Sequence, residues 1–274
     1  MRNRNRRALV AYFTLAYAFS WGIGIPLALS NHGLIDPVLP VWSHYLIGYG
    51  PALSAFIVAA TVQGRPALRD LTSRIVRWDV GFFWWAVALA PVLISVVSAR
   101  LIAVFGGTSI GLSDFGNVHF LPSLGPAALL LWMLTFGIGE EIGWRGFALP
   151  RLQKERSALS ATVVLVMLWA LWHLPQFFYV FEPSIAVGWL AGLAAGGITF
   201  TWLFNSTRGS VLIVAVAHGA FNFGTASITA PDSVAAVTSS VVMIWAVIVI
   251  LVFKPRDLSR WPKSEFPARR DPSD

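Results

Sequence analysis

The stretch Thr135-Phe-Gly-Ile-Gly-Glu-Glu-Ile-Gly-Trp-Arg-Gly-Phe-Ala-Leu-Pro150 ends an apolar run that begins near Leu124. It is decisive for the fold because it places two adjacent carboxylates, Glu140 and Glu141, in a segment that otherwise resembles a membrane helix. A carboxylate at membrane depth costs roughly 2.5 kcal/mol or more on insertion scales, so such residues are functional candidates. Both acids are therefore candidates for a site inside the protein.

Helical geometry gives the two acids different surroundings. Glu141 and Arg145 are four residues apart, so they share one helix face, with the acid N-terminal to the base as the favourable orientation requires. Glu140 lies about 100° around the helix from Glu141 and has no partner expected in its own segment. We expect Arg145 to neutralise and orient Glu141 as structural support, which leaves Glu140 available for chemistry.

The composition indicates a polytopic membrane protein of the all-α class, a bundle of transmembrane helices. The chain is 56% hydrophobic and only 12% charged, whereas soluble domains carry about 25% charged residues. It contains no cysteine, which excludes disulfides, thiolate zinc sites and a cysteine nucleophile.

About eight apolar segments are long enough to cross a bilayer, which takes about 20 residues. They lie near residues 8–29, 43–63, 80–105, 124–146, 159–180, 185–204, 210–229 and 234–253. The first is expected to be a retained helix, because it is long enough to span and has no obvious signal-peptide cleavage site. We expect one transmembrane domain over residues 1–253 and a disordered, cytosolic tail over residues 254–274, which is polar and contains four prolines.

The basic residues fix the expected orientation. If the N-terminus is inside, 19 of the 20 Lys and Arg residues fall on the inner side, and the outer loops contain none. The positive-inside rule then predicts a multi-pass protein of the cell membrane, plasma or inner, with both termini in the cytosol. The net charge of +7 is thus mainly a topological signal, with contact to membrane lipid secondary and no nucleic-acid partner expected.

A stripe of small residues marks the sixth segment. Gly188, Gly192 and Gly196 recur every four residues, which is typical of a face that lets a neighbouring helix approach closely. We expect tight helix packing there.

Two of the five histidines lie within apolar segments. His173 follows Trp169 by one helical turn, and His218 precedes Asn222 by the same spacing, so each pair shares a face. The other three histidines, which lie in or beside outer loops and are expected to be solvated or interfacial, are His32, His44 and His119.

The depths of these residues agree in part. At 1.5 Å per residue, Glu140 and His218 lie roughly 12–14 Å from the inner surface, and His173 lies nearer to about 21 Å. The fit of His173 therefore requires tilt, a shifted helix start or a deep cavity. The side chains expected to converge within the bundle, and predicted to be catalytic, are Glu140, His173, His218 and Asn222.

This set suits the activation of water against a carbonyl group. Glu140 can serve as general base, and His173 can hold the same water or shuttle its proton. His218 and Asn222 can donate hydrogen bonds to a developing oxyanion. Alternatively, Glu140, His173 and His218 form a His₂Glu zinc set, with Glu141 supporting a metal ligand. Spacing alone does not choose between a metal-free site and zinc.

The three motifs together resemble the CAAX-protease and bacteriocin-processing family, which includes the type II CAAX prenyl endopeptidases and proteins described as intramembrane metalloproteases. The motifs are Glu140-Glu141-x-x-x-Arg145, an aromatic-x-x-x-His173 and His218-x-x-x-Asn222, in that order on separate helices. The resemblance covers roughly residues 120–230. One departure is Trp169, where the second motif usually has Phe, which bears on substrate preference.

The resemblance implies an intramembrane endopeptidase with a cavity open to the cytosol, acting near the C-terminus of lipidated or membrane-associated substrates. It also implies that Glu140 and His173 activate water while His218 and Asn222 stabilise the oxyanion. A glutamate-dependent mechanism without a required cofactor fits these residues better than a zinc mechanism.

Two other functions remain as alternatives. A proton-coupled transporter would also bury Glu and His residues, but the chain shows no internal repeat to supply alternating access. A catalytically inactive membrane protein, binding a peptide or conferring bacteriocin self-immunity, would use the same cavity. The presence of all four polar residues together favours the protease.

Overall fold

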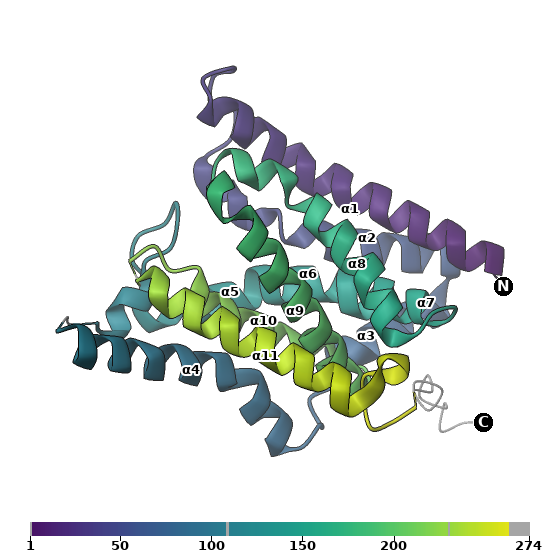
Figure 1. Ribbon diagram of the computed structural model, residues 1–274. Coiled ribbons are helices and arrows are strands. Elements are labelled where there is room, and N and C mark those ends of the chain that lie inside the picture. The colour runs from purple at the N-terminus through teal and green to yellow at the C-terminus, as the bar shows by residue number, and fades with distance from the viewer. Residues whose placement is uncertain (1, 108–109, 230, 263–274) are drawn as a thin grey trace.

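The computed structural model describes residues 2–107, 110–229 and 231–262, and within these ranges the chain forms helices and no strand. Six helices are long and apolar enough to cross a membrane by length and composition, and two shorter apolar helices cover residues 49–63 and 211–225. The predicted helical bundle is confirmed (Figure 1). The six long helices and the two shorter ones coincide with the eight predicted segments.

The first half of the chain supplies four helices. They are α1 (Arg2–Asn31), α2 (Tyr49–Val58, extended by a π-helical turn over Ala59–Gln63), α3 (Arg65–Ile75) and α4 (Phe82–Gly106). Residues 64–79 lie between two of the predicted membrane segments, and α3, which hydropathy did not reveal, occupies most of this connection. Two residues mark the start of α3 in the sequence. Gly64 permits the turn before the helix, where its φ is 82°, and Pro66 lies in the first turn of α3.

The second half of the chain holds the predicted site. One irregular helix runs from Gly125 to Gln153 and contains α5 (Ala128–Trp132), α6 (Ile138–Glu141) and α7 (Leu149–Gln153), joined by π-helical turns over Met133–Gly137 and Ile142–Ala148. It is followed by α8 (Ala158–Trp172), α9 (Ala186–Ser206), α10 (Val211–Thr225) and α11 (Asp232–Asp257). Glu140 and Glu141 thus lie between two π-helical turns, which often mark functional positions in helices.

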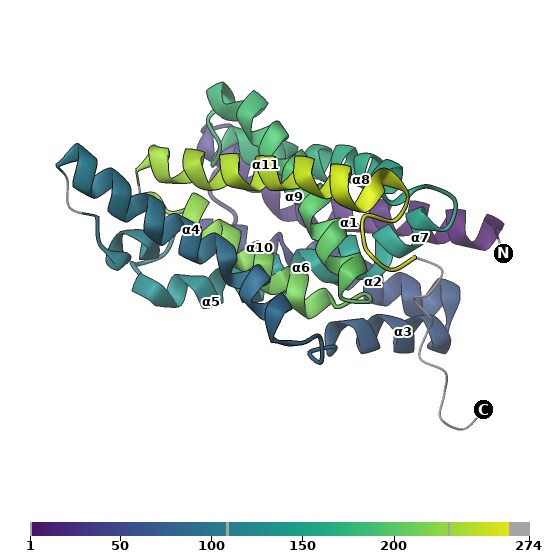
Figure 2. The ribbon, with the colours of Figure 1, turned by 60° about the horizontal axis from the view of Figure 1, so that its bottom comes forward.

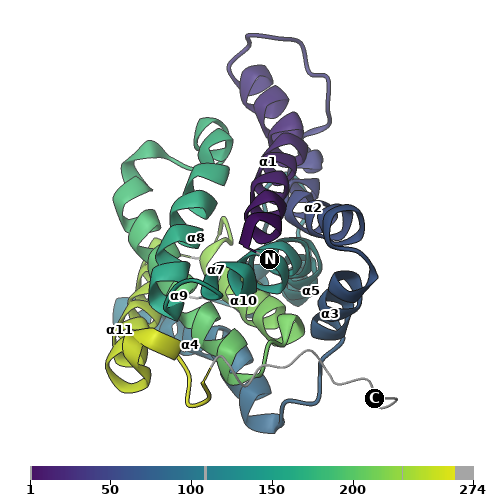
Figure 3. The ribbon, with the colours of Figure 1, turned by 90° about the vertical axis from the view of Figure 1, so that its right-hand side faces the viewer.

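The helices surround α10. This helix contacts α4, α5, α6, α9 and α11, and a view along the bundle places it between the α1–α2 pair and the group of α4, α9 and α11 (Figure 3). Helix α2 joins the two parts, because it packs on both α1 and α6. The helices that carry the predicted site residues are therefore central in the bundle.

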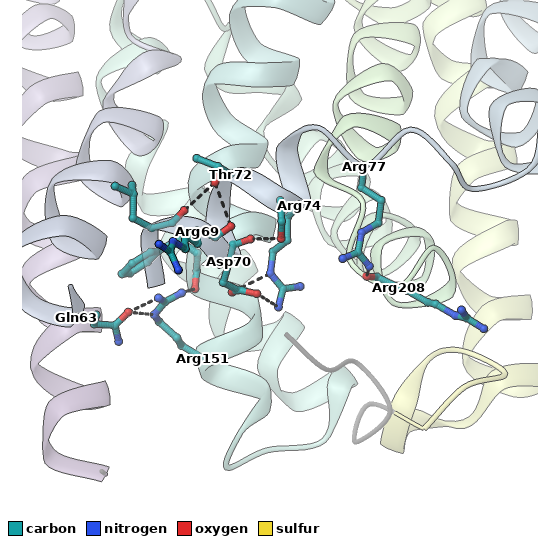
Figure 4. A network of polar contacts seen from close by, with 11 residues as sticks. Gln63, Arg69, Asp70, Thr72, Arg74, Arg77, Arg151 and Arg208 are labelled. Atoms are coloured by element: carbon teal, nitrogen blue, oxygen red, sulfur yellow. Dashed lines mark hydrogen bonds and ion pairs between the residues drawn. The ribbon is translucent and has the colours of Figure 1, made fainter. Parts of the chain in front are cut away.

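One end of the bundle is held together by arginines. Figure 4 shows Arg74 paired with both oxygens of Asp70 within α3, at 3.0 Å each, and Arg151 of α7 binding Gln63, with an Nε–Oε1 distance of 3.1 Å. Arg77 donates to the backbone oxygen of Arg208. We call this the basic end; α3 lies across it beside the end of α2 (Figure 2).

Close helix contacts occur both on α9, where a Cβ atom added to Gly197 would lie 2.4 Å from Val166 Cγ2, and on the irregular helix that contains α6. A Cβ atom added to Gly139 would lie 2.6 Å from the backbone oxygen of Gly48, and one added to Gly143 would lie 2.5 Å from Pro51 Cβ. By contrast, a Cβ atom on Gly188 or Gly196 would meet no described atom within 4 Å. A Cβ atom on Gly192 would meet Met243 of α11 at 3.8 Å, so α11 lies against the α9 stripe but does not approach it as tightly as predicted.

His44 is also not solvated as expected. Its side chain is only 5% exposed, and its Nδ1 lies 3.0 Å from the hydroxyl of Tyr179 in a cluster of aromatic rings. Burial, with smaller effects from His119 and His173, lowers the pKa of His44 to about 3. The segment between α1 and α2 folds inward at this end of the bundle, opposite the basic end.

The first residues of the predicted tail are folded. α11 is kinked at Lys254, where φ is 61°, and ends at Asp257. The backbone oxygen of Asp257 accepts a 2.7 Å hydrogen bond from Asn205, and Leu258 is fully buried. Residues 263–274 lie outside the described part of the chain, so the disorder predicted there stays a prediction.

Two glycine-to-alanine changes test the close approach of α6 to α2. Gly139→Ala is expected to lower stability by about 1–3 kcal/mol, because the added methyl group meets backbone that cannot move aside. Gly196→Ala is the matched control and is expected to be neutral or stabilising by up to about 1 kcal/mol from helix propensity. Thermal unfolding of both purified variants measures the difference; equal midpoints would contradict the packing.

Candidate functional site

The acidic pair lies in the interior of the bundle. Glu140 is 2% exposed, and Glu141 and Arg145 are fully buried. Helix α6 is fixed in this position from two sides, because its glycines let α2 approach and a Cβ atom at Gly137 would lie 2.5 Å from the backbone oxygen of Ala215 in α10. The two carboxylates therefore depend on protein groups for their partners.

The expected pair between Glu141 and Arg145 is present. Arg145 Nη1 lies 2.8 Å from Glu141 Oε1, and His218 Nδ1 reaches the same oxygen at 2.9 Å. The guanidinium group lies over two aromatic rings, 4.5 Å from the centroid of Trp169 and 5.1 Å from that of Phe200. Arginine suits this position because its planar group stacks on aromatic faces while it pairs with a carboxylate.

Glu140 has no cation as a described partner, but it does have hydrogen-bond donors. Its Oε2 accepts from Trp144 Nε1 at 3.1 Å and from Trp169 Nε1 at 2.6 Å. The expectation that Glu140 lacks a partner in its own segment is therefore wrong. The sequence contained the signal, since Trp144 follows Glu140 by the same four residues that separate Glu141 from Arg145.

His173 caps the end of α8 beside the pair. Its Nδ1 lies 2.8 Å from the backbone oxygen of Trp169, and its ring centroid lies 5.0 Å from that of Trp189 and 5.8 Å from that of Trp169. The sequence placed His173 deeper in the membrane than Glu140 and His218. The structure explains this difference in depth, because Trp169, one turn earlier on α8, is the residue that reaches Glu140. His173 lies one turn beyond it.

His218 contacts Glu141, where convergence on Glu140 was expected. Its ring centroid also lies 5.7 Å from that of Trp169 and 5.3 Å from that of Phe200. Asn222 follows one turn later on α10 and is partly buried, but no hydrogen bond of its carboxamide occurs among the described contacts. Glu140, His173 and His218 thus gather around Trp169, and Asn222 is not joined to them.

The hydrogen bonds assign the proton on each imidazole. A backbone oxygen only accepts, so His173 Nδ1 carries the hydrogen and Nε2 is left with a lone pair. His218 Nδ1 donates to the Glu141 carboxylate by the same reasoning, so its Nε2 donates only when the ring is cationic. The two histidines are thereby suited to different roles.

The residues of the zinc alternative do not form a ligand set in this arrangement. Within the described ranges, no group of three His, Cys, Asp or Glu side chains is placed to hold a metal ion. The Oε2 atom of Glu140 is already bound by two indole N–H groups, and His218 is turned toward Glu141. Among the described residues, Glu140, His173 and His218 are therefore not arranged as three ligands of one zinc ion.

Tyr12 of α1 is a neighbour that the sequence did not reveal. It is fully buried, with its ring centroid 5.8 Å from that of Trp144, and its hydroxyl has no hydrogen-bond partner in the described chain. A Cβ atom on Gly143 would lie 2.5 Å from that hydroxyl. Glu141 Oε2 and Arg145 Nε are also buried without a described partner, so polar atoms of α1 and α6 are left with hydrogen-bonding capacity.

Comparison with known proteins shows a similarity that covers the segment containing these motifs. Residues 122–224 match the family described as type II CAAX prenyl endopeptidase, Rce1-like. The predicted resemblance is confirmed. CAAX prenyl protease 2 of Methanococcus maripaludis is 29% identical over 181 residues, which cover 62% of this chain and 62% of that protein. The match therefore spans less than two thirds of the relative, and the family segment contains α6, α8 and α10 but neither α1 nor α2.

Removing the cation beside Glu141 tests the buried pair. Arg145→Met is expected to destabilise the protein by about 3–5 kcal/mol, because it leaves a buried carboxylate without its main partner. The double change Glu141→Gln with Arg145→Met should regain much of that loss, since it removes both charges. Thermal unfolding in detergent measures both; an Arg145→Met variant as stable as the unmodified protein would refute the pairing argument.

Proposed function

We propose that the protein is an intramembrane endopeptidase that hydrolyses a peptide bond of a membrane-associated substrate. The observation that carries the proposal is Glu140: a buried carboxylate held by indole N–H groups, with His173 and His218 on neighbouring helices. The similarity to the CAAX prenyl endopeptidases supports the same reaction class.

In the proposed reaction Glu140 acts as general base. It takes a proton from a water molecule whose oxygen adds to the carbonyl carbon of the scissile bond. His173 holds the same water through the lone pair on Nε2. The carbon–nitrogen bond of the tetrahedral intermediate then breaks, and the proton held by Glu140 passes to the leaving amine, so that water is divided between the two products.

The oxyanion needs hydrogen-bond donors. His218 supplies one from Nε2 when its ring is cationic, while its Nδ1 lies against Glu141 Oε1. Asn222 is the second proposed donor, one turn along α10, and its carboxamide is not engaged by any described group. Removal of one such donor costs about 10²–10³ in rate in other enzymes.

The substrate class follows from the relatives. We propose a membrane-associated protein or peptide cut near a C-terminal, CAAX-like sequence, since the relatives carry the names CAAX prenyl endopeptidase and CAAX prenyl protease. The proposed setting is the cell membrane with the basic end and both termini in the cytosol, in accordance with the distribution of Lys and Arg.

Glu140→Gln is the direct test of the reaction. The amide keeps the shape and can still accept the indole hydrogen bonds, but it cannot take a proton. Cleavage of a membrane-tethered reporter ending in a prenylated CAAX sequence is expected to fall to background, with thermal stability little changed. Undiminished cleavage would remove Glu140 from its role, whereas binding without cleavage by the unmodified protein would favour an inactive peptide-binding protein.

A chelator test decides metal dependence. We expect purified protein to keep its activity after incubation with a strong chelator and to contain no stoichiometric zinc, because the described geometry gives Glu140, His173 and His218 other partners. Elemental analysis and the reporter assay, run on the same preparation, provide the measurement. Stoichiometric zinc together with loss of activity in chelator would replace the metal-free mechanism with a zinc mechanism.

A further inference from the structure

Trp169 contacts four of the charged or titratable side chains gathered around α6. Its indole N–H donates to Glu140 at 2.6 Å, and its ring lies against Arg145, His173 and His218. The side chain is 2% exposed, so these contacts are made away from solvent.

The two carboxylate oxygens of Glu140 differ in their hydrogen bonding. Both described bonds to this carboxylate, from Trp144 and from Trp169, go to Oε2. A carboxylate held through one oxygen by two donors from different helices has little freedom to rotate, and Oε1 is left to meet a water molecule. The donors are neutral, so they fix the carboxylate without neutralising it as Arg145 neutralises Glu141.

We propose that Trp169 is a positioning residue of this site: its N–H fixes Oε2 of Glu140 so that Oε1 addresses the reacting water, and its ring sets the separation of the two imidazoles. This inference rests on the proposed function. A phenylalanine at this position would keep an aromatic wall but would lose the N–H donor. The tryptophan therefore affects the hydrogen bonding of Glu140 as well as the size of the pocket.

The chain offers a matched control on the same helix. Trp172 is 1% exposed, also packs against the ring of His173, at 4.7 Å between centroids, and its N–H has no hydrogen-bond partner in the described chain. Replacing either tryptophan by phenylalanine removes the same atoms from the interior. Only the change at position 169 removes a hydrogen bond to Glu140.

Steady-state kinetics with a prenylated CAAX peptide then separate the roles. Trp169→Phe is expected to lower kcat by roughly tenfold or more, in the range seen when a supporting hydrogen bond to a functional group is lost, with KM changed less than twofold. Trp172→Phe should change kcat less than twofold at a similar unfolding midpoint. An unchanged kcat for Trp169→Phe, or an equal loss for Trp172→Phe, would overturn the proposal.

A second measurement does not depend on activity. In a double-mutant cycle of thermal unfolding, Trp169→Phe is combined with Glu140→Met, which removes the acceptor. The midpoint shifts are expected to be clearly non-additive for this pair and additive for Trp172→Phe with Glu140→Met. Additive shifts for Trp169→Phe would overturn the positioning role. Non-additive shifts in a protein that cleaves no peptide would instead reject the proposed function and leave the interaction in place.

Discussion

The buried charge of Glu141 is the constraint on which the rest of this arrangement depends. A carboxylate in an apolar interior is tolerated only with a cation and hydrogen bonds nearby. Arg145 supplies the cation from the next turn of the same helix, and His218 brings a donor from α10. Arg145 in turn lies on the rings of Trp169 and Phe200. The pair of Glu141 and Arg145 is therefore the place where side chains of α8, α9 and α10 meet the irregular helix that contains α6.

The burial of Glu141 with its two partners also explains why Glu140 has a different set of partners. Arg145 and His218 both bind Glu141, so Glu140, about 100° further around the helix, is left to neutral donors. Adjacent carboxylates in different surroundings commonly divide structural and chemical work between them. Here helix geometry gives the two acids different partners, because only one of them can share a face with Arg145.

The parts of this picture that depend on composition and on local spacing could be predicted from the sequence. Long apolar runs located the helices, and a four-residue spacing placed Arg145 beside Glu141. The details that depend on three-dimensional packing could not be predicted in the same way. The indole of Trp169 reaches Glu140 only because α8 crosses α6 at that level, and His44 is buried only because a connecting segment folds inward.

The glycines also show that helix packing cannot be predicted from residue spacing alone. In the stripe, Gly188 and Gly196 meet no atom of another helix within 4 Å and Gly192 meets only Met243 at 3.8 Å, whereas Gly139 and Gly143, which have the same four-residue spacing, meet the backbone and Pro51 of the α2 region. Periodicity identifies a face that permits close approach, but the partner helix decides whether the approach occurs. Helix α3 was missed for a related reason, since a short amphipathic helix between two apolar segments resembles a polar connection in hydropathy alone.

The site is not complete within the segment that matches the family. Residues 122–224 supply the two acids, the arginine and both histidines, yet α6 is held on one side by α2 and is approached by the hydroxyl of Tyr12 from α1. Because Gly143 has no side chain, that hydroxyl and Pro51 can both lie against the π-helical turn that follows the acids. The enclosure of Glu140 and Glu141 therefore depends on helices outside the matched segment. A change in α1 or α2 would alter the surroundings of the acids while leaving every motif residue in place, so conservation of the motifs alone does not guarantee the same site geometry among similar chains.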